Sequence, residues 1–261
     1  GVEGAYSYEA VQDFFGASVR CRAVPTFEAA LEAVEQGSAA LAMLPIENSS
    51  AGAVGDVYDL LVRHEVTIAA QEILKIDHAL LALPGVEQKD IVRVYSHPQG
   101  LMQCSRFLDG FPAWDRIPLS NTAVSARTIR ESGDRQAAAI ASRTAGELYG
   151  LQVLAPHIQN VSGNTTRFVL VSAGKIRLRN AAKVCLCVDC RDEAGALYRL
   201  LSHFAFHHIN MTRIESRPIP QKTWKYRFFI DFEGNLADPG VQSVLAGITD
   251  EASGCRILGT C

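Results

Sequence analysis

The sequence lacks long apolar runs and any large excess of one charge. No hydrophobic stretch approaches the roughly 20 residues that cross a membrane, and the first residues lack the basic and apolar segments of a secretory signal. The 25 Lys and Arg residues are scattered without a basic stripe or tail among 28 Asp and Glu, so the net charge is −3. We therefore expect neither nucleic acid nor an anionic membrane as a partner.

Nucleotide-binding motifs and a disulfide framework are missing as well. Neither the G-x-G-x-x-G pattern nor the Walker pattern occurs, so we infer neither a dinucleotide nor a nucleotide ligand. The seven cysteines, an odd number spread through 261 residues, fit a reducing compartment better than paired disulfides. These absences together predict a cytosolic protein.

The densest cysteine cluster does not have the spacing of a metal site. Cys185 and Cys187 lie two apart in an apolar run, so in a strand both face the same side, and no fourth ligand beyond Cys190 is suitably spaced. We interpret them as buried small hydrophobic residues. Three histidines of one predicted helix also lack a carboxylate at metal-binding spacing, and we expect them to be structural or solvent-facing: His203, His207 and His208.

What the chain does contain is apolar patterning for two domains. Its 48% hydrophobic composition is ample for two cores. Residues 1–172 alternate strand and helix patterns, which is typical of an α/β sheet with helices on its faces. Strands are predicted at 18–24, 39–46, 66–74, 78–83, 93–95, 117–119, 136–141, 151–154 and 166–172. Helices are predicted at 7–15, 26–37, 54–63, 98–108, 123–131 and 142–149.

A second, smaller pattern follows a basic and polar stretch at residues 177–180, which we interpret as a linker. Strands are predicted at 182–190, 209–218, 225–233 and 256–258, helices at 195–207 and 239–248, and a turn at 219–222. This order, βαββαβ, is that of ferredoxin-like folds. A module of this size is too small to carry much chemistry unaided.

The polar loop that ends in the motif N-T-T-R-F, residues 164–168, is the first candidate site. Thr166 can hydrogen-bond a small oxygen and Arg167 can bind a carboxylate through two parallel bonds, a combination suited to a small anionic substrate. The alternative interpretation of the same sequence is a turn residue and a surface arginine before an ordinary strand.

Polar loops also precede four predicted helices, and exposed N–H groups at helix starts can bind anions. They could equally be ordinary N-caps. The four junctions are at Ser7, at residues 48–50, at residues 96–99 and at residues 121–122.

Six motifs stand in chain order: G-V-E-G-A-Y-S at residues 1–7, P-I-E-N-S-S-A-G at 45–52, S-H-P-Q at 96–99, N-T-T-R-F at 164–168, G-A-L-Y at 195–198 and E-S-R-P at 215–218. Together they resemble prephenate dehydratase fused to an ACT regulatory domain. The resemblance implies a lyase that converts prephenate to phenylpyruvate in phenylalanine synthesis. Arogenate dehydration and a non-catalytic amino-acid sensor are the alternatives.

The sequence departs from the family pattern in two places. Ala5 stands where family members usually carry threonine, so a hydrogen bond is missing from that loop or is supplied by Ser7. The chain begins at the first glycine of its motif, although the family has a short apolar strand before it. The region of Trp224 resembles bifunctional mutase-dehydratases, which leaves open whether a chorismate mutase domain precedes this chain.

The resemblance also implies an α/β fold of two domains and an oligomer. Residues 1–176 would form two lobes similar to type 2 periplasmic binding proteins, lobe one near 1–75 and 155–175 and lobe two near 76–154. Residues 182–261 would form the ferredoxin-like ACT domain. Such domains pair across chains, so we expect a homodimer or tetramer.

The family's reaction implies roles for individual residues and requires no metal, Schiff base or redox cofactor. Thr166 matches the essential threonine and would donate a hydrogen bond to the departing oxygen. Arg167 would clamp a carboxylate or form a structural ion pair. Glu47 would orient a donor, carry a proton or cap a helix, and His97 is the second candidate acid. The predicted catalytic residues are Thr166, Arg167, Glu47, Asn48 and His97, and the predicted substrate-binding residues are Ser7, Ser49, Ser96, Gln99, Thr122, Asn164 and Phe168.

Phenylalanine is the effector that the resemblance implies. A glycine at a helix start lets a ligand approach the backbone, where free N–H groups favour an anion. The predicted effector-binding residues are Gly195, Ala196, Leu197, Asn210, Glu215, Ser216, Arg217 and Pro218.

Overall fold

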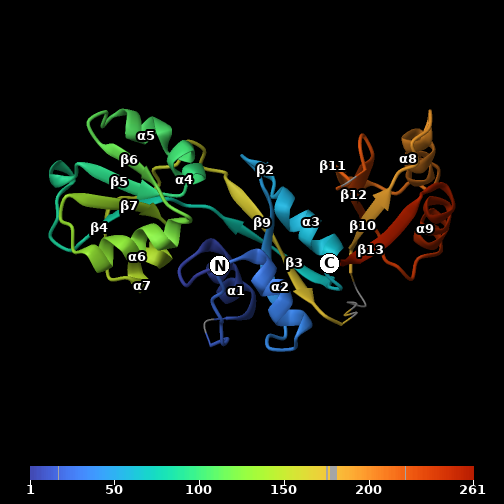
Figure 1. Ribbon diagram of the computed structural model, residues 1–261, viewed down its shortest axis with the longest axis horizontal. Helices are drawn as coiled ribbons and strands as arrows, with labels where there is room; N and C mark the ends of the chain where they lie inside the picture. Colours follow the sequence, from blue (N-terminus) through green and yellow to red (C-terminus); the bar gives the residue numbers. More distant parts are fainter. Residues whose placement is uncertain (17, 175, 177–180, 221) are drawn as a thin grey trace. The chain divides into compact units, whose positions relative to one another are not determined.

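The computed structural model describes residues 1–16, 18–174, 176, 181–220 and 222–261 (Figure 1). The chain forms two compact units. Unit 1 comprises Gly1–Thr26, Glu47–Gly52 and Glu72–Phe168, and unit 2 comprises Phe27–Ile46, Ala53–Gln71 and Val169–Cys261. The linker predicted at residues 177–180 lies outside the described residues.

Unit 1 contains a five-stranded sheet in the order β6-β5-β7-β4-β8. β5 pairs in parallel with β6 and β7, and β4 pairs antiparallel with β7 and β8. Small and branched side chains bury the central strands on both faces; β7, for example, is A-A-A-I-A and fully buried. The strands are β4 (Ala79–Ala82), β5 (Arg93–Ser96), β6 (Asp115–Pro118), β7 (Ala137–Ala141) and β8 (Gln152–Ala155).

The helices of unit 1 begin and end at residues suited to those positions. The Asn121 side chain accepts a hydrogen bond from the Val124 N–H at the start of α6, which ends at Gly133 with a φ of 66°. Figure 1 shows α5 on one side of the sheet and α6 and α7 on the other. The helices are α1 (Tyr6–Phe15), η1 (Gln88–Asp90), α4 (Pro98–Gln103), α5 (Ser105–Asp109), α6 (Thr122–Ser132) and α7 (Arg143–Leu148).

The single helix predicted at residues 98–108 is wrong, because the chain breaks it into α4 and α5 at Cys104. Asn160 interrupts the helical ladder: its Nδ2 donates to the Met102 carbonyl and its Oδ1 accepts from the Arg106 N–H. The Asn160 N–H also donates to the Gln103 carbonyl at 2.6 Å. A side chain inserted in this way is an established cause of a helix break.

An eight-stranded sheet in the order β11-β12-β10-β13-β3-β9-β1-β2 carries unit 2. Four of its strands also contain residues of unit 1: β1 (Ala42–Asn48), β2 (Gly52–Ala53), β3 (Thr67–Lys75) and β9 (Thr165–Ser172). The other four lie in the C-terminal region: β10 (Lys183–Asp189), β11 (Met211–Pro218), β12 (Tyr226–Glu233) and β13 (Gly254–Thr260).

The C-terminal region of unit 2 has the predicted element order βαββαβ. Its two helices, α8 (Ala196–Phe206) and α9 (Pro239–Glu251), pack together and bury Phe204 and Ile248 against β10 and β12. The other two helices of unit 2 are α2 (Phe27–Glu35) and α3 (Gly55–Arg63). Cys185 and Cys187 are buried in an apolar cluster with Tyr58 of α3, which confirms that they are core residues, whereas Cys190 is half-buried.

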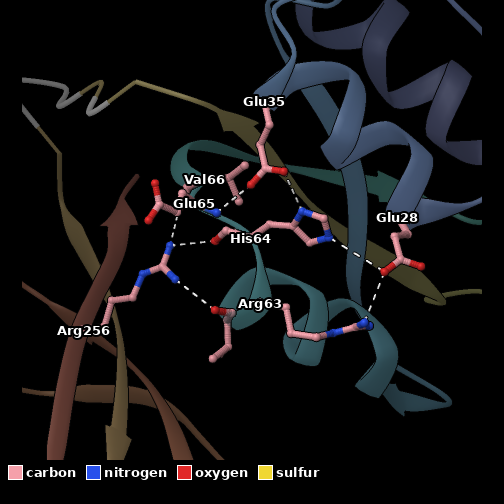
Figure 2. Close-up of polar contacts among 8 residues, drawn as sticks. Glu28, Glu35, Arg63, His64, Glu65, Val66 and Arg256 are labelled. Carbon is pink, nitrogen blue, oxygen red and sulfur yellow. Dashed lines mark hydrogen bonds and ion pairs between the residues drawn. The ribbon is translucent and has the colours of Figure 1, made fainter.

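The end of α3 is held by an arginine from β13 (Figure 2). The Arg256 guanidinium donates to the carbonyl oxygens of Val62, His64 and Val66 at 3.2, 3.0 and 2.9 Å. Carbonyl groups at a helix end have no helical partner, so the guanidinium supplies the donors that they lack.

His64 ties the same helix end to α2 (Figure 2). Its Nδ1 lies 2.8 Å from Glu35 Oε2, and its Nε2 lies 3.9 Å from Glu28 Oε1, which also pairs with Arg63 at 3.1 Å. The hydrogen bond with His64 and one from the Glu65 N–H lower the pKa of Glu35 below its ordinary value.

Two further predictions about residues 1–26 are wrong. Residues 18–24 form a turn and irregular backbone because their alternation has no buried face: Arg20 and Arg22 are exposed and no residue of the segment is buried. Ser7 is not the N-cap of α1. Ala5 holds that position, without a side-chain bond, and Ser7 lies in the first turn.

None of the helices in the described part of the chain is both long and apolar enough to cross a membrane. Because β13 pairs with β3 in one sheet, unit 2 groups the C-terminal region with residues from the first half of the chain. The predicted division into domains of residues 1–176 and 182–261, and the two lobes of the first, stay predictions.

Candidate functional site

The motif of residues 164–168 opens a strand, as predicted, since β9 begins at Thr165. The alternation of β9 buries Thr166 and Phe168, while Thr165 and Arg167 are partly exposed. Asn164, just before the strand, is only 1% exposed. A hydroxyl and an amide are therefore fixed side by side in a largely dry environment, where hydrogen bonds are strong.

Asn48, the last residue of β1, binds this motif through its amide nitrogen. Nδ2 lies 2.9 Å from Thr166 Oγ1, 2.9 Å from Asn164 Oδ1 and 3.1 Å from the Thr165 carbonyl oxygen. The Ser49 N–H also donates to that carbonyl. Two motifs that lie more than a hundred residues apart are thus joined in unit 1. The catalytic and substrate-binding roles of Asn48, Asn164 and Thr166 stay predictions.

Only the oxygen of the Asn164 side-chain amide has hydrogen-bond partners among the described residues. Its Oδ1 accepts from Asn48 Nδ2 at 2.9 Å, Ser50 Oγ at 3.1 Å and Ser49 Oγ at 3.3 Å. Its Nδ2 is buried and has no hydrogen-bond partner among the residues that the structure describes. Rotating the amide would oppose Nδ2 to these donors, so Nδ2 remains a buried donor for a ligand oxygen.

Glu47 and Arg167 form an ion pair, with their side chains 33% and 19% exposed. For Arg167 the sequence predicted either direct binding of a substrate carboxylate or a structural ion pair. The Arg167 guanidinium is engaged by Glu47, and because side chains alternate along β9, Arg167 and the buried Thr166 point to opposite faces of the strand. Its contact with substrate stays a prediction.

The S-H-P-Q residues surround the start of α4. Ser96 is fully buried and donates to the Ile140 carbonyl at 2.8 Å, and His97 is the N-cap, with Nδ1 accepting from the Gln99 N–H. Burial lowers the pKa of His97, so the neutral imidazole is favoured. A Cβ at Gly100 would lie 2.5 Å from Ser96 Oγ and 3.4 Å from Thr122 Cγ2, so only glycine lets α4 approach these hydroxyl-bearing residues.

Within the described residues no hydrogen bond joins Ser96, His97, Gln99 or Thr122 to the Asn48 network. Ser7, in α1, is likewise outside it. The structure therefore joins part of the predicted set by hydrogen bonds, namely Asn48, Ser49, Asn164 and Thr166, and it pairs Glu47 with Arg167. Phe168 is a buried residue of β9.

Three residues that sequence analysis missed extend the network. Gln103, the last residue of α4, donates from Nε2 to Asn48 Oδ1 at 3.4 Å, and its Oε1 lies 3.0 Å from His78 Nε2. His78 Nδ1 in turn lies 2.9 Å from the Tyr6 hydroxyl. The only sequence signal was a histidine directly before a buried apolar strand, and nothing in the letters paired it with Gln103.

The predicted effector residues lie in unit 2. Gly195 is the N-cap of α8 and has a φ of 79°, which favours glycine, while Ala196 is buried. The segment from Glu215 to Pro218 ends β11, at the edge of the sheet, and Ser216 is exposed. The Arg217 guanidinium is already engaged by Asp59 of α3 at 2.6 Å. Leu197 and Asn210 lie near the start and after the end of α8.

A pocket of about 680 Å³ in unit 2 lies away from these residues. Residues of β3, α9 and β13 line it, including Arg256, whose guanidinium is bound to backbone carbonyls. None of the predicted site residues does. The chemistry suggested by Thr166 and Asn164 therefore does not depend on this pocket.

Comparison with known proteins covers the whole chain. The family model described as Prephenate dehydratase matches residues 1–176. Arogenate dehydratase 1 of Petunia hybrida is 39% identical over 279 residues, and the match spans 100% of this chain but 65% of that protein, just under two thirds.

Two solved structures match over the full length. Prephenate dehydratase of Arthrobacter aurescens in complex with L-Phe is 35% identical with a TM-score of 0.91, covering 100% of this chain and 87% of that chain. A structure described as GqqA, a novel type of quorum quenching acylases, is 31% identical with a TM-score of 0.90, covering 100% and 95%. On the family match and the 35% identical relative, the chain belongs to the prephenate dehydratase family.

Proposed function

We propose that this protein catalyses the decarboxylative dehydration of prephenate to phenylpyruvate, a step in phenylalanine synthesis. The observation that carries the proposal is the bond from Asn48 Nδ2 to Thr166 Oγ1 at 2.9 Å. Because the threonine oxygen accepts from this amide, its own hydrogen is directed elsewhere. That hydrogen is the donor for the departing ring hydroxyl.

The reaction needs little more than such donors. The bond between the ring and its carboxylate breaks, its electrons enter the ring, and carbon dioxide leaves. The ring hydroxyl takes one proton, supplied in the end by solvent, and departs as water, and the ring becomes aromatic. A hydrogen-bond donor aimed at the oxygen that gains charge lowers this barrier, by about 3 to 4 kcal/mol for a well-placed group.

Buried donors beside Thr166 suit the anionic substrate. The unpartnered Asn164 Nδ2 would bind a substrate oxygen, and the Glu47–Arg167 pair would present a guanidinium to a carboxylate. Within the described residues no hydrogen bond joins His97 to the Asn48 network that holds Thr166, which favours Thr166 over His97 as the donor.

Prephenate and arogenate differ by a ketone or an amino group on the side chain. A relative named arogenate dehydratase and one named prephenate dehydratase are 39% and 35% identical to this chain. We propose prephenate because its ketone oxygen can accept from the buried, unpartnered Asn164 Nδ2, whereas a protonated amino group cannot. Comparing turnover of the two substrates separates them.

The similarity to an acylase raises a second function. An acylase that uses a hydroxyl nucleophile places it beside a base that removes its proton. The partner of Thr166 Oγ1 is the Asn48 N–H, a donor, which supports the dehydratase.

Regulation by phenylalanine is part of the proposal. The similar Arthrobacter protein was solved with L-Phe, and residues 183–260 have the βαββαβ order of ACT domains. We propose that this region binds phenylalanine between copies of a homo-oligomer. Gly195 at the start of α8 and Ser216 in β11 would contribute to the site.

The test is the reaction. Purified protein is incubated with prephenate, and phenylpyruvate is read by its strong absorbance in alkali. We expect product well above the spontaneous, acid-sensitive rate. Product at only the spontaneous rate, or release of a carboxylic acid from an acyl amide in its place, would overturn the dehydratase assignment.

A further inference from the structure

A single arrangement of donors and acceptors fits the hydrogen-bond chain behind Thr166. Asn48 Oδ1 accepts from the N–H groups of Ser50 and Ala51, both at 3.0 Å, and Asn48 Nδ2 faces three oxygen atoms. Rotating this amide would oppose N–H to N–H at one end and oxygen to oxygen at the other. The orientation of Asn48 is therefore fixed by its backbone partners.

The fixed Asn48 decides the orientation of Gln103. Gln103 Nε2 donates to Asn48 Oδ1, so Gln103 Oε1 points to His78 Nε2 at 3.0 Å. An oxygen there requires a hydrogen on His78 Nε2. A reversed Gln103 amide would instead place two oxygen atoms against each other at Asn48.

Tyr6 completes the chain at the other side of the imidazole. With its hydrogen on Nε2, a neutral His78 accepts at Nδ1, where the Tyr6 hydroxyl lies 2.9 Å away. The same hydroxyl lies 3.0 Å from the Asp77 carbonyl oxygen, its alternative acceptor. His78 is 2% exposed, so no water replaces either partner.

We propose that His78 is a positioning residue of the dehydratase site: its Nε2–H holds the Gln103 amide so that Gln103 offers an N–H to the substrate. Gln103 Nε2 carries two hydrogens and, within the described part of the chain, one long hydrogen bond of 3.4 Å. The second N–H is the donor for a substrate oxygen beside the amide that binds Thr166. This role rests on the proposed function.

A double-mutant cycle tests whether His78 acts through Gln103. We expect His78→Leu and Gln103→Leu each to lower kcat/KM by about 10- to 100-fold, and the double variant to be no slower than Gln103→Leu alone. His78→Gln keeps an N–H and should recover to within about threefold of wild type. Losses that multiply in the double variant would overturn the role, since a merely structural histidine would act independently of Gln103.

The matched control is His157→Asn. His157 is an exposed histidine of unit 1 that binds Asp77 and has a φ of 55°, a conformation that asparagine tolerates. We expect it to keep wild-type kcat/KM. A loss comparable to that of His78→Leu would mean that any histidine substitution in unit 1 is harmful, and would overturn the assignment.

Nitrogen NMR of the wild-type imidazoles tests the hydrogen-bond direction without any variant. We expect His78 to carry its hydrogen on Nε2 at neutral pH, and a hydrogen on Nδ1 or a doubly protonated ring would overturn the proposal. Absence of prephenate turnover in the wild type would overturn the proposed function and this role with it. Turnover with multiplying losses would overturn only the role of His78.

Discussion

Thr166 illustrates how a hydrogen bond and burial can orient the O–H bond of a weakly acidic hydroxyl. A threonine O–H rotates freely and is a poor acid. The Asn48 N–H occupies a lone pair of its oxygen, and burial to 8% exposure removes competing water. What remains for the hydroxyl hydrogen is a ligand acceptor.

For Thr166→Ala we therefore expect a turnover at least about a hundredfold lower with the fold intact, because one donor to developing charge is lost without a large cavity. Thr166→Ser is the matched control and should retain most of the activity. Turnover at saturating prephenate and a urea unfolding curve are measured for both. A folded alanine variant with near-normal turnover would remove Thr166 from the mechanism.

The buried imidazole of His78 predicts a pH-dependent stability. Desolvation lowers its pKa below the ordinary value of 6.5, so between the two values the unfolded chain binds a proton that the folded protein excludes. This contribution to the free energy of unfolding is fully present above pH 6.5 and is lost as the pH falls toward the lowered pKa.

Urea unfolding near pH 7.5 and near pH 5.5 measures the loss, which should be smaller in His78→Gln than in the wild type. His157→Asn should behave as the wild type does. Equal losses in the wild type and His78→Gln would show that His78 titrates alike in both states.

At the residue scale, the sequence singled out Asn48, Asn164 and Thr166 by their motifs, and the structure joins them. The sequence alone could not identify the residues that these side chains contact. The contact of Asn48 with Asn164 spans 116 positions, and that of His78 with Gln103 depends on where α4 ends. Such pairs follow from tertiary packing, which residue types alone do not encode.

At the scale of elements, α4 and α5 show that a residue distant in sequence can end a helix that the local sequence favours. The letters of residues 98–108 favour one helix. Asn160 takes the Met102 and Gln103 carbonyls and the Arg106 N–H instead, and the helix ends at the residue that binds His78 and Asn48. No local propensity signals a break made from so far along the chain.

Replacing Asn160 by alanine should lower the free energy of unfolding by about 1 kcal/mol, since the Met102 carbonyl and the Arg106 N–H lose their side-chain partner. Because α4 would lengthen past Gln103, turnover should fall as well, by about tenfold or more. Ser142→Ala, which removes the N-cap bond of α7 to the Ala145 N–H, is the control. It should cost about 1 kcal/mol with unchanged turnover. If Asn160→Ala is destabilised but keeps wild-type turnover, the break between α4 and α5 does not position the site.

For the whole molecule, the chain passes repeatedly between the two units, yet the core of unit 1 is continuous in sequence. Every residue of that core lies between Ala79 and Ile158. The sheet of five strands is complete within the same span. By contrast, β9 lies between β3 and β1 in the other sheet.

A fragment of residues 72–168 should therefore unfold cooperatively in urea when produced alone. A fragment of residues 1–71 lacks β9 and should show no cooperative transition, because β1 and β3 have lost the strand between them. Circular dichroism during urea titration distinguishes the two. A gradual transition in the fragment 72–168 would mean that its sheet depends on the other segments of the chain.

The proposed binding of phenylalanine belongs to the same scale, because the effector would act on a site in another part of the chain. Calorimetry should detect phenylalanine binding to the wild type and a loss of at least about tenfold in affinity with Ser216→Ala combined with Gly195→Val. If phenylalanine binding is coupled to the dehydratase site as proposed, the coupling is reciprocal, and each ligand shifts the affinity of the other by the same factor. Unfolding curves establish that the variant folds. Unchanged binding in the folded variant would place the effector site elsewhere.

The contact between the Ser49 N–H and the Thr165 carbonyl oxygen also affects how readily Asn48 is deamidated. Asparagine loses ammonia when the next backbone nitrogen attacks its side-chain carbon, and Asn48 is followed by a small serine. Here that nitrogen donates to Thr165 at 2.9 Å and the Asn48 amide is held at both ends, so the ring closure is blocked while the protein is folded. Deamidation at position 48 would put a carboxylate where Thr166 needs a donor. Its rate in stored protein should therefore report how often this loop opens.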